Sequence, residues 1–438
     1  MKHFRNFLPD FELVPSESMA PRTLKNSTFA ILAGVMAAIS IFSACMEEPI
    51  PYDLSNTDLY LDTLSVQSFE ATTFQSPPEM GTISTLYLGQ GNGFSNQYIL
   101  IKLSNENTTK TLAMHQLGDS SFVIDSSYMQ IWYDGDSIDI TASFQLSYFP
   151  NAGDSLFGEY TSHYLDPSLS ELSAMAVNIA QTMLVQDSVD TLLEEPNPPY
   201  LYFPISQSVI GDLADSTTAN YTFMLTAVDS LYSRIGFQSR EGGTATSPRL
   251  YIDYQYTSTD TMGVTTTDTT SSSFLTVADL SFTKPPGVAA VDSVNLTIGR
   301  ANGFKSLLKL EIDSLDFPAN TTIRKANISF EVNEGDSLDG FKVVGYPLES
   351  EPLSFSYQVL DEDSYTTSSS YFISGTVSDG HIVLDLKYYI HGIIQGKIQN
   401  YGIKLYSSIT NNPFELLHLE TTNPDSIDPV LKVQYVYP

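Results

Sequence analysis

The stretch Leu86-Tyr-Leu-Gly-Gln-Gly-Asn-Gly-Phe94 decides the fold, because it occurs a second time as Leu296-Thr-Ile-Gly-Arg-Ala-Asn-Gly-Phe304. Further pairs of matching blocks follow the same order: Pro77-Pro78 with Pro285-Pro286, Gly135–Asp139 with Gly335–Asp339, Asn220-Tyr221 with Asn400-Tyr401, and Pro248–Tyr254 with Pro429–Tyr435. A long internal repeat is the sequence signature of duplicated structural units. The sequence therefore predicts two copies of one module, at residues 57–256 and 274–438.

Short segments in both copies alternate apolar or aromatic residues with polar ones. Tyr128–Tyr133 and Arg249–Tyr256 show this in the first copy, and Leu431–Tyr437 shows it in the second. A period of two, interrupted by Gly, Asn, Asp and Pro turns, is typical of strands with one buried face. We therefore predict an all-β protein of two tandem antiparallel β-sandwich modules, jelly-roll-like, with minor helical insertions.

Three segments depart from this alternation. Residues 167–195 are surplus to the first copy and place apolar residues near a helical period between Leu169 and Leu184, so we predict a helical insert that caps one end of the sandwich. A shorter helix is expected near Ile382–Lys397. Residues 257–273 are rich in Ser and Thr, which is compatible with a flexible linker or with a long hairpin that turns at Met262-Gly263.

The amino-terminal region resembles a lipoprotein signal peptide. Phe29–Ala44 carries no charge and is shorter than the ~20 residues of a membrane-spanning helix, and it is followed directly by Cys45, the only cysteine. Small residues before a cysteine resemble the lipobox of bacterial lipoproteins, which implies cleavage of residues 1–44, acylation of Cys45 and a tether over 45–56. The alternative is an ordinary secretory signal beside an unrelated cysteine.

Two further features bear on the export of the chain. Acidic residues precede Met19 and basic residues follow it, so translation starting at Met19 would give a conventional signal peptide. Glu47-Glu48, directly after the cysteine, resembles the surface-export signal of Bacteroidetes-type lipoproteins. The predicted location is therefore the bacterial outer membrane or cell surface, with a lipid anchor in the membrane.

The charge of the chain limits its partners. The sequence has 51 acidic and only 20 basic residues, which gives a formal net charge of −31. Nucleic acid as a partner would need a basic surface, so it is excluded. The single cysteine also excludes a disulfide scaffold and a thiolate zinc cluster. Polysaccharides and envelope proteins remain as partners, besides the membrane that holds the lipid anchor.

Several blocks resemble the DNRLRE module, a disaggregatase-related β-sandwich domain of bacterial and archaeal surface proteins. The resemblance is carried by Leu307–Ile312, Phe317–Phe330, Asn400–Leu405, the triplet Ser239-Arg-Glu241 and Pro248–Tyr254. It covers nearly all of both copies, although the second copy has His418-Leu-Glu420 in place of the triplet. The resemblance implies a β-sandwich fold and carbohydrate binding, since the family is described as binding alginate-type ligands.

The sequence assigns no catalytic residue and no organic cofactor. Its histidines form no H-E-x-x-H pair, and no G-x-S-x-G nucleophile elbow is present. Two acidic turns place oxygen ligands at alternate positions, which calcium favours, so a structural calcium is one interpretation and a solvated hairpin turn is the other. The calcium candidates are Asp134, Asp136, Asp139, Glu334, Asp336 and Asp339.

Four residues are candidate ligand contacts. Trp132, the only tryptophan, and Tyr133 end a predicted strand, and exposed aromatic rings can contact the apolar faces of sugars. Asn92 and Asn302 belong to repeated Asn-Gly turns, which serve either as plain tight turns or as ligand-contacting loops. Three hypotheses follow: a non-catalytic polysaccharide-binding envelope lipoprotein, a structural or adhesive scaffold that contacts proteins, and a glycan hydrolase or lyase. We favour the first and expect no enzymatic activity.

Overall fold

The alternating segments form antiparallel strands throughout the chain. We describe a computed structural model, in which residues 59–438 are described except for 136–140, 151–155, 165, 167, 186–197, 216–220, 288–294, 313–315, 334–337, 353–362, 364 and 422–428. Residues Tyr60–Pro438 form one compact unit. The predicted signal peptide 1–44, the tether 45–56 and Cys45 lie outside the described residues.

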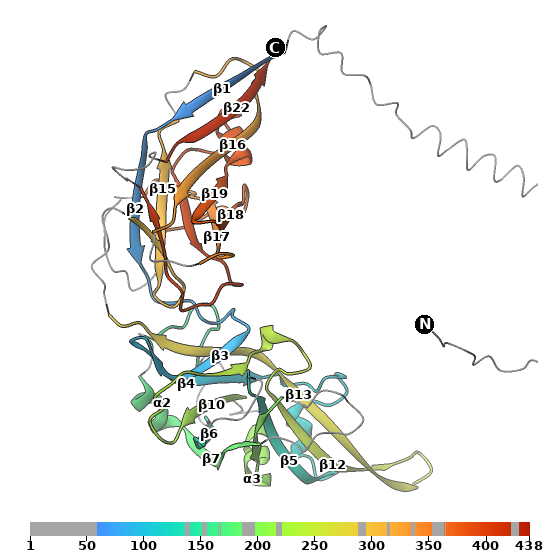
Figure 1. Cartoon of the computed structure of the whole chain (residues 1–438). Helices are drawn as coiled ribbons and strands as arrows, with labels where there is room; N and C mark the ends of the chain where they lie inside the picture. Colours follow the sequence, from blue (N-terminus) through green and yellow to red (C-terminus); the bar gives the residue numbers. More distant parts are fainter. Residues whose placement is uncertain are drawn as a thin grey trace, which may run out of the picture. The chain divides into compact units, whose positions relative to one another are not determined.

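The first sheet contains eleven strands and carries the first repeat (Figure 1). Along the sheet the strands are β7 (Val177–Thr182), β6 (Phe144–Tyr148), β10 (Thr222–Ala227), β4 (Phe94–Leu103), β13 (Thr265–Lys284), β12 (Arg249–Thr259), β5 (Phe122–Trp132), β9 (Tyr200–Pro204) and β8 (Leu184–Val185), with β3 (Thr85–Gly91) joining β4 to β11 (Ile235–Gln238). Its inward side chains, such as Leu88, Phe203 and Phe237, are fully buried in one core.

The second sheet has nine strands and carries most of the second repeat. Its order is β1 (Tyr60–Val66), β22 (Leu431–Tyr437), β16 (Thr322–Glu331), β19 (His381–Asp385), β18 (Ile373–Ser378), β17 (Lys342–Pro347), β20 (Ile403–Ser407), β15 (Phe304–Leu310) and β2 (Phe69–Gln75). A separate ribbon pairs β14 (Asn295–Ile298) with β21 (Leu417–Glu420). A second core, which includes Phe330 and Leu405, fills this half.

Matching ladders show that the duplication extends to the strand register. In the first sheet, Leu250 lies between Phe274 on one side and Met129 on the other. In the second sheet, its counterpart Leu431 lies between Val66 and Ile328. Equivalent positions of the two repeats therefore have equivalent neighbours. The prediction of an all-β protein built from antiparallel, sandwich-like sheets is confirmed.

The two repeats exchange their leading strands. β2 leads into Pro77-Pro78 at the start of the first repeat, but it pairs with β15 of the second sheet. β13 leads into Pro285-Pro286 at the start of the second repeat, but it pairs with β4 of the first sheet. The predicted module boundaries of 57–256 and 274–438 are therefore wrong. The first sheet is built from a continuous segment that ends with β13, and the second is completed by β1 and β2 from the start of the chain.

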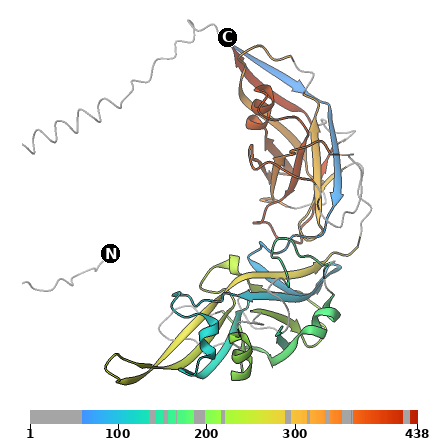
Figure 2. The same cartoon turned by 180° about the vertical axis from the view of Figure 1, so that it is seen from behind.

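This exchange brings the two ends of the folded unit together. The full length of β1 pairs with β22, from Tyr60 opposite Tyr437 to Val66 opposite Leu431. Figure 1 shows the two strands, blue and red, side by side, and Figure 2 shows the same pair from behind. The first residues of the unit thus complete a sheet whose other strands come mainly from its last third.

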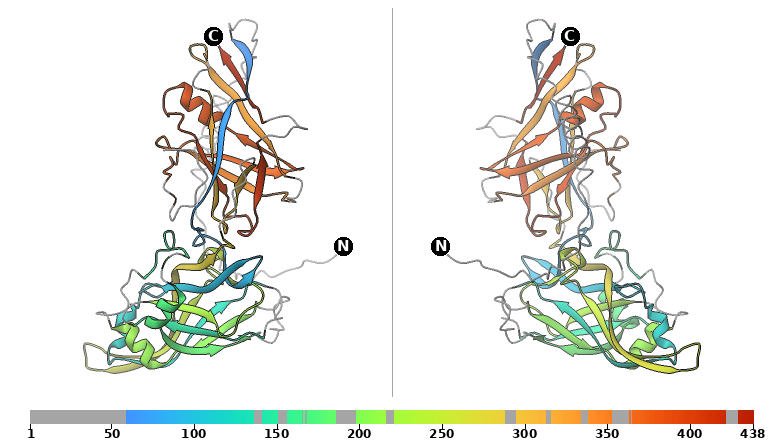
Figure 3. Two further views of the ribbon diagram at one scale, coloured as in Figure 1. Left: turned by 90° about the vertical axis from the view of Figure 1, so that its left-hand side faces the viewer. Right: turned by 90° about the vertical axis from the view of Figure 1, so that its right-hand side faces the viewer.

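The Ser- and Thr-rich segment 257–273 is a hairpin. β12 and β13 pair continuously from Arg249 opposite Leu275 to Thr259 opposite Thr265. Gly263 has φ +79° in the turn, where the Asp260 carboxylate accepts the backbone N–H groups of Met262 and Val264. The hairpin interpretation with its turn at Met262-Gly263 is confirmed, and Figure 3 shows the long ribbon extending beyond its neighbours.

The predicted helical insert 167–195 is only partly helical over its described residues, 168–185; residues 167 and 186–195 lie outside the described residues. Within this described part the helix is α2 (Leu169–Met175), which begins at the capping box of Ser168 and Glu171 and ends where Ala176 takes an extended conformation. The chain then continues as β7 and β8, because Val177–Thr182 pairs with the edge strand β6. Backbone pairing with an open edge outweighs the helical spacing of the apolar residues.

The other helices are short. α4 (Lys387–Ile394) lies inside the predicted range Ile382–Lys397, whose first residues belong to β19 instead. α3 (Gln207–Ala214) was not predicted; it begins at the Ser206 N-cap and buries Ile210 and Leu213 in the first core. Two 3-10 turns, η2 (Met114–Gly118) and η3 (Arg240–Gly242), complete the secondary structure of the described residues.

A buried ionic network lies beside the exchanged strand β2. Lys305, which pairs with Phe74 of β2, donates to Asp363 at 2.9 Å and to Glu79 at 2.6 Å. Lys404 donates to the same Asp363 at 3.0 Å. Burial alone would raise the pKa of Asp363, but the two ammonium groups outweigh it and hold that pKa below its ordinary value.

Candidate functional site: a carboxylate cluster and an aromatic face

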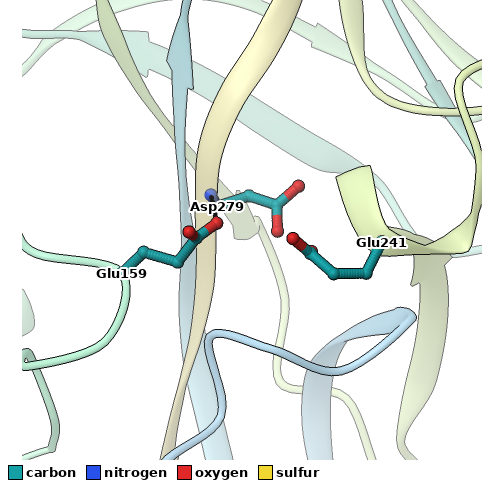
Figure 4. Close-up of side chains that lie close together, drawn as sticks. All are labelled: Glu159, Glu241 and Asp279. Carbon is teal, nitrogen blue, oxygen red and sulfur yellow. Dashed lines mark hydrogen bonds between the residues drawn. The ribbon is translucent and has the colours of Figure 1, made fainter.

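Three carboxylates converge at the first sheet, as Figure 4 shows. Glu159 follows β6, Glu241 lies in η3, and Asp279 lies on β13. One oxygen from each group can be chosen so that all three lie within 4.8 Å of one another. We call these three residues the carboxylate cluster. Asp279 is 1% exposed, and the side chains of Glu159 and Glu241 are 5% and 24% exposed.

The local backbone explains how the carboxylate cluster is positioned. Ser239 caps η3 by accepting the N–H of Glu241, and its hydroxyl donates to the carbonyl of Ile83 at 2.7 Å. The backbone N–H of Arg240 donates to Asp279 Oδ2 at 2.8 Å, and the N–H of Asp279 donates to Glu159 Oε1 at 3.1 Å. The carboxylates of Asp279 and Glu159 are therefore each held by the main chain of a segment distant in the sequence, whereas the Glu241 carboxylate accepts from the side chain of its neighbour Arg240.

Arg240 compensates only part of the negative charge. Its guanidinium group lies 3.1 Å from Glu159 Oε2 and 2.7 Å from Glu241 Oε1. If Asp279 were ionised together with both glutamates, the one guanidinium would leave two negative charges uncompensated. Burial, with the carboxylates of Glu241 and Glu159 adding to it, raises the pKa of Asp279 to about 8. The cluster therefore favours uptake of a positive charge, either a proton or a metal ion.

One oxygen of the cluster lacks a hydrogen-bond donor. Asp279 Oδ1 is buried and has no partner among the described residues. An unpaired buried acceptor costs roughly 1–3 kcal/mol, because it has lost its bonds to water. Asp279 thus presents an unsatisfied oxygen in a region of excess negative charge.

Sequence reasoning found only one part of this cluster. Ser239-Arg-Glu241 was singled out by its resemblance to a family motif, whereas Glu159 and Asp279 were not identified. Asp279 carried a detectable signal, because it interrupts the apolar end of a strand between Val277 and Phe282. Glu159 carried none, since a glutamate in an acidic loop looks the same whether or not it is buried.

The predicted asparagine contacts lie in different environments. Asn92 is exposed in the turn between β3 and β4 with φ +53°, as a tight Asn-Gly turn requires. Asn302 is only 9% exposed, and its backbone carbonyl accepts the side-chain amide of Gln75 at 2.8 Å. Because the exchanged strand β2 covers this turn, Asn302 does not offer an open ligand contact.

The predicted calcium turns are only partly described. Asp134 accepts hydrogen bonds from Thr85 Oγ1 at 2.6 Å and Gln238 Nε2 at 2.5 Å. Asp339 accepts the backbone N–H of Asp379 at 3.1 Å. These bonds connect the two turns to β3, to β11 and to the turn between β18 and β19. The remaining candidates lie outside the described residues: Asp136, Asp139, Glu334 and Asp336.

Trp132 belongs to a group of aromatic residues on the outer side of the first sheet. The inward residues on these strands, such as Ile131, Leu201 and Ile252, are completely buried, whereas the alternate residues face outward. Neighbouring strands place their aromatic positions side by side. We call this group the aromatic face; it consists of Trp132 and Tyr128 on β5, Tyr200 and Tyr202 on β9, and Tyr251 on β12.

Rings of the aromatic face contact one another across the strands. Tyr128 stacks on Tyr202 with ring centroids 4.7 Å apart and on Tyr251 with centroids 4.9 Å apart. Trp132 meets Tyr200 edge to face at 5.1 Å and is half-buried. Tyr133, the remaining sequence candidate, packs against the first core and so is not part of the face.

Comparisons with known proteins add no assignment. No family model, curated protein or solved structure matches the chain. None of the helices in the described residues has the length and apolar character needed to cross a membrane.

Proposed function

We propose that the protein is a non-catalytic, lipid-anchored envelope protein that binds a neutral polysaccharide through its aromatic face. The observation that carries the proposal is the gathering of five outward aromatic residues on three neighbouring strands of one sheet. Anchoring through Cys45 at the outer membrane or cell surface rests on the sequence, as does the resemblance to a carbohydrate-binding family.

The geometry of the aromatic face indicates how a sugar would be held. Tyr202, Tyr128 and Tyr251 cover one another's ring faces within the stack, so Tyr128 in the middle has a neighbouring ring against each of its two faces. Tyr202 ends the stack and is 39% exposed, which leaves its outer ring surface available. Aromatic side chains with one apolar surface and one polar end suit ligands that combine C–H faces with hydroxyl groups.

Charge favours a neutral ligand. The chain has a formal net charge of −31, which repels a polyuronate at long range. Arg249, beside Tyr251, already donates to the backbone carbonyls of Ser247 and Thr244. The aromatic face itself contains no basic residue that could neutralise an acidic sugar.

Affinity electrophoresis tests this proposal. The full chain, solubilised in detergent, would be run through gels that contain neutral polysaccharides or alginate. We expect retardation by a neutral polysaccharide, and a loss of at least tenfold in affinity for Tyr202→Ala, which corresponds to about 1.4 kcal/mol. Tyr232→Ala is the matched control, because Tyr232 is 91% exposed and lies in the loop before β11.

The outcomes separate the competing functions. Failure of all neutral polysaccharides to retard the wild-type chain would refute glycan binding and favour the scaffold hypothesis. Equal losses for Tyr202→Ala and Tyr232→Ala would place the binding site elsewhere. Release of new reducing ends from a polysaccharide would show enzymatic activity and overturn the non-catalytic assignment.

A further inference from the structure

We propose that Glu159, Glu241 and Asp279 bind one divalent cation of the calcium class. This site is different from the acidic turns that the sequence singled out and is independent of polysaccharide binding. It would act as a structural tie, because its three ligands come from a loop, a 3-10 turn and a strand that are far apart in the sequence.

The spacing of the carboxylate cluster matches the size of one ion. Calcium binds its oxygen ligands at roughly 2.3–2.6 Å, so two ligands on opposite sides of the ion lie about 5 Å apart. The three chosen oxygens lie within 4.8 Å of one another. A single calcium ion can therefore reach all three with small side-chain adjustments.

The unpaired oxygen of Asp279 points to a missing partner. Asp279 is 1% exposed, and its Oδ2 accepts the backbone N–H of Arg240. Its Oδ1 has no donor among the described residues. Figure 4 shows this carboxylate directed toward that of Glu241, while the Glu159 carboxylate lies beside the Asp279 backbone nitrogen. A cation in the cluster would satisfy an oxygen that the protein leaves without a bond.

Arg240 does not fill this role. Its guanidinium group binds the oxygens Glu159 Oε2 and Glu241 Oε1, so its single positive charge is shared between these two carboxylates. Its hydrogen bond to Asp279 comes from the backbone N–H and is accepted by Oδ2, which leaves Oδ1 without a donor in the described part of the chain. Asp279 and the opposite oxygen of Glu159, which accepts one backbone N–H, remain able to bind a metal ion.

Calcium fits this donor set better than magnesium. Calcium accepts six to eight oxygens in flexible geometry, whereas magnesium requires a near-ideal octahedron and keeps several of its waters. Asp279 and Glu159 are almost fully buried and are held by main-chain bonds, so an ion bound there must give up water on that side, which magnesium does reluctantly. The cluster contains neither the histidine nor the cysteine ligands that zinc favours.

The second repeat lacks an equivalent site. Ala71 lies six residues before Pro77, as Asp279 lies six residues before Pro285, so the buried aspartate of β13 is replaced by alanine in β2. One ion per chain is therefore expected, despite the duplication of the module.

Calcium titration of the full chain after treatment with EDTA tests the proposal. Isothermal titration calorimetry should give one calcium per chain, and calcium should raise the melting temperature. Asp279→Asn keeps the size of the side chain but removes its charge, and should weaken calcium binding at least tenfold. Asp134→Asn is the matched control from a predicted calcium turn and should bind as the wild type does.

Each remaining outcome overturns part of the argument. If the wild-type chain binds no calcium, or if Asp279→Asn binds with unchanged affinity, the cluster is not a cation site and a shared proton accounts for it. Equal affinity for magnesium would refute the calcium assignment. Should Asp279→Asn fail to fold by circular dichroism, Glu241→Gln at the more exposed side of the cluster provides the same test.

Discussion

The exchange of leading strands makes a quantitative prediction for Phe74 of β2. Phe74 is completely buried against Leu307 and Leu348, and its ring centroid lies 5.0 Å from that of Tyr365. All three partners belong to the second repeat. Replacing a buried phenylalanine by alanine costs about 3–5 kcal/mol, from the lost burial and from the cavity that remains. Phe74→Ala should therefore remove a large share of the unfolding free energy of a typical domain.

A double-mutant cycle tells whether that loss arises in the second sheet. Leu307 contacts Phe74, whereas Leu100, its counterpart in the first repeat, lies in a separate cluster. Residues in contact show coupling energies of about 0.5–3 kcal/mol, and distant residues are additive within about 0.5 kcal/mol. We therefore expect Phe74→Ala to couple with Leu307→Ala and to be additive with Leu100→Ala.

Urea unfolding followed by far-UV circular dichroism provides the measurement. Phe372→Ala is the control, because Phe372 is 49% exposed; this variant should lower the unfolding free energy much less than Phe74→Ala does. If the double alanine variants are too unstable to fold, Phe74→Leu replaces Phe74→Ala in both cycles. Coupling of Phe74 with Leu100 and additivity with Leu307 would show that β2 stays with its own repeat, and would refute the exchange.

Three further predictions concern other parts of the chain. Gly303→Ala should lower the unfolding free energy, measured with urea, clearly more than Gly340→Ala does. The new Cβ at position 303 would lie 1.7 Å from the Ser76 carbonyl oxygen, whereas Gly340, also at positive φ, faces open space, so Gly340→Ala should lower the unfolding free energy by about 1 kcal/mol. The folded protein holds the pKa of Asp363 below its unfolded value of about 3.9, so ionised Asp363 stabilises the fold above that pH, and this stabilisation is lost as the pH falls through the folded pKa. Asp363→Asn should therefore flatten the acid side of the profile of melting temperature against pH between pH 5 and 2. An unchanged slope would contradict the ionic network. Cys45→Ser should abolish labelling of the chain by an alkyne fatty acid in cells, and retained labelling would disprove the predicted acylation site.

The sequence was sufficient to predict the strands and their duplication. Repeated blocks such as Pro248–Tyr254 and Pro429–Tyr435 also correspond in register, because a shift by one residue would turn each buried face outward. The repeat could not show which copy receives each leading strand. β2 and β13 would meet equivalent partner strands whether each pairs within its own repeat or with the other repeat. The local sequence pattern therefore does not distinguish the two arrangements.

The prediction of a helical insert was inaccurate because it, too, depended on a pairing partner that the local sequence does not show. Apolar residues of α2, β7 and β8 fall near a helical period, but Val177–Thr182 lies beside the open edge of β6 and forms strand hydrogen bonds instead. Periodicity records which residues are apolar, and the partner that becomes available in the tertiary structure decides between helix and strand.

The candidate sites were predictable only to the level of residue type. Alternation identified the strand that contains Trp132, but the outer position of Tyr202 and Tyr251 follows from the sheet order. Likewise, nothing local distinguishes Glu159 from the other acidic residues until the fold buries it. The resemblance of Ser239-Arg-Glu241 to a family motif was the one clue that led toward the carboxylate cluster.

The carboxylate cluster depends on the strand exchange. Glu159 and Glu241 belong to the first repeat, but Asp279 lies on β13, the leading strand of the second repeat. A first repeat that ended before this strand would lack both the β4 pairing of β13 and the buried aspartate. Because β2 carries Ala71 at the equivalent position, the return exchange cannot build a second cluster. Calcium affinity therefore reports on whether β13 is docked, and the asymmetry between the two copies follows from one residue on each exchanged strand.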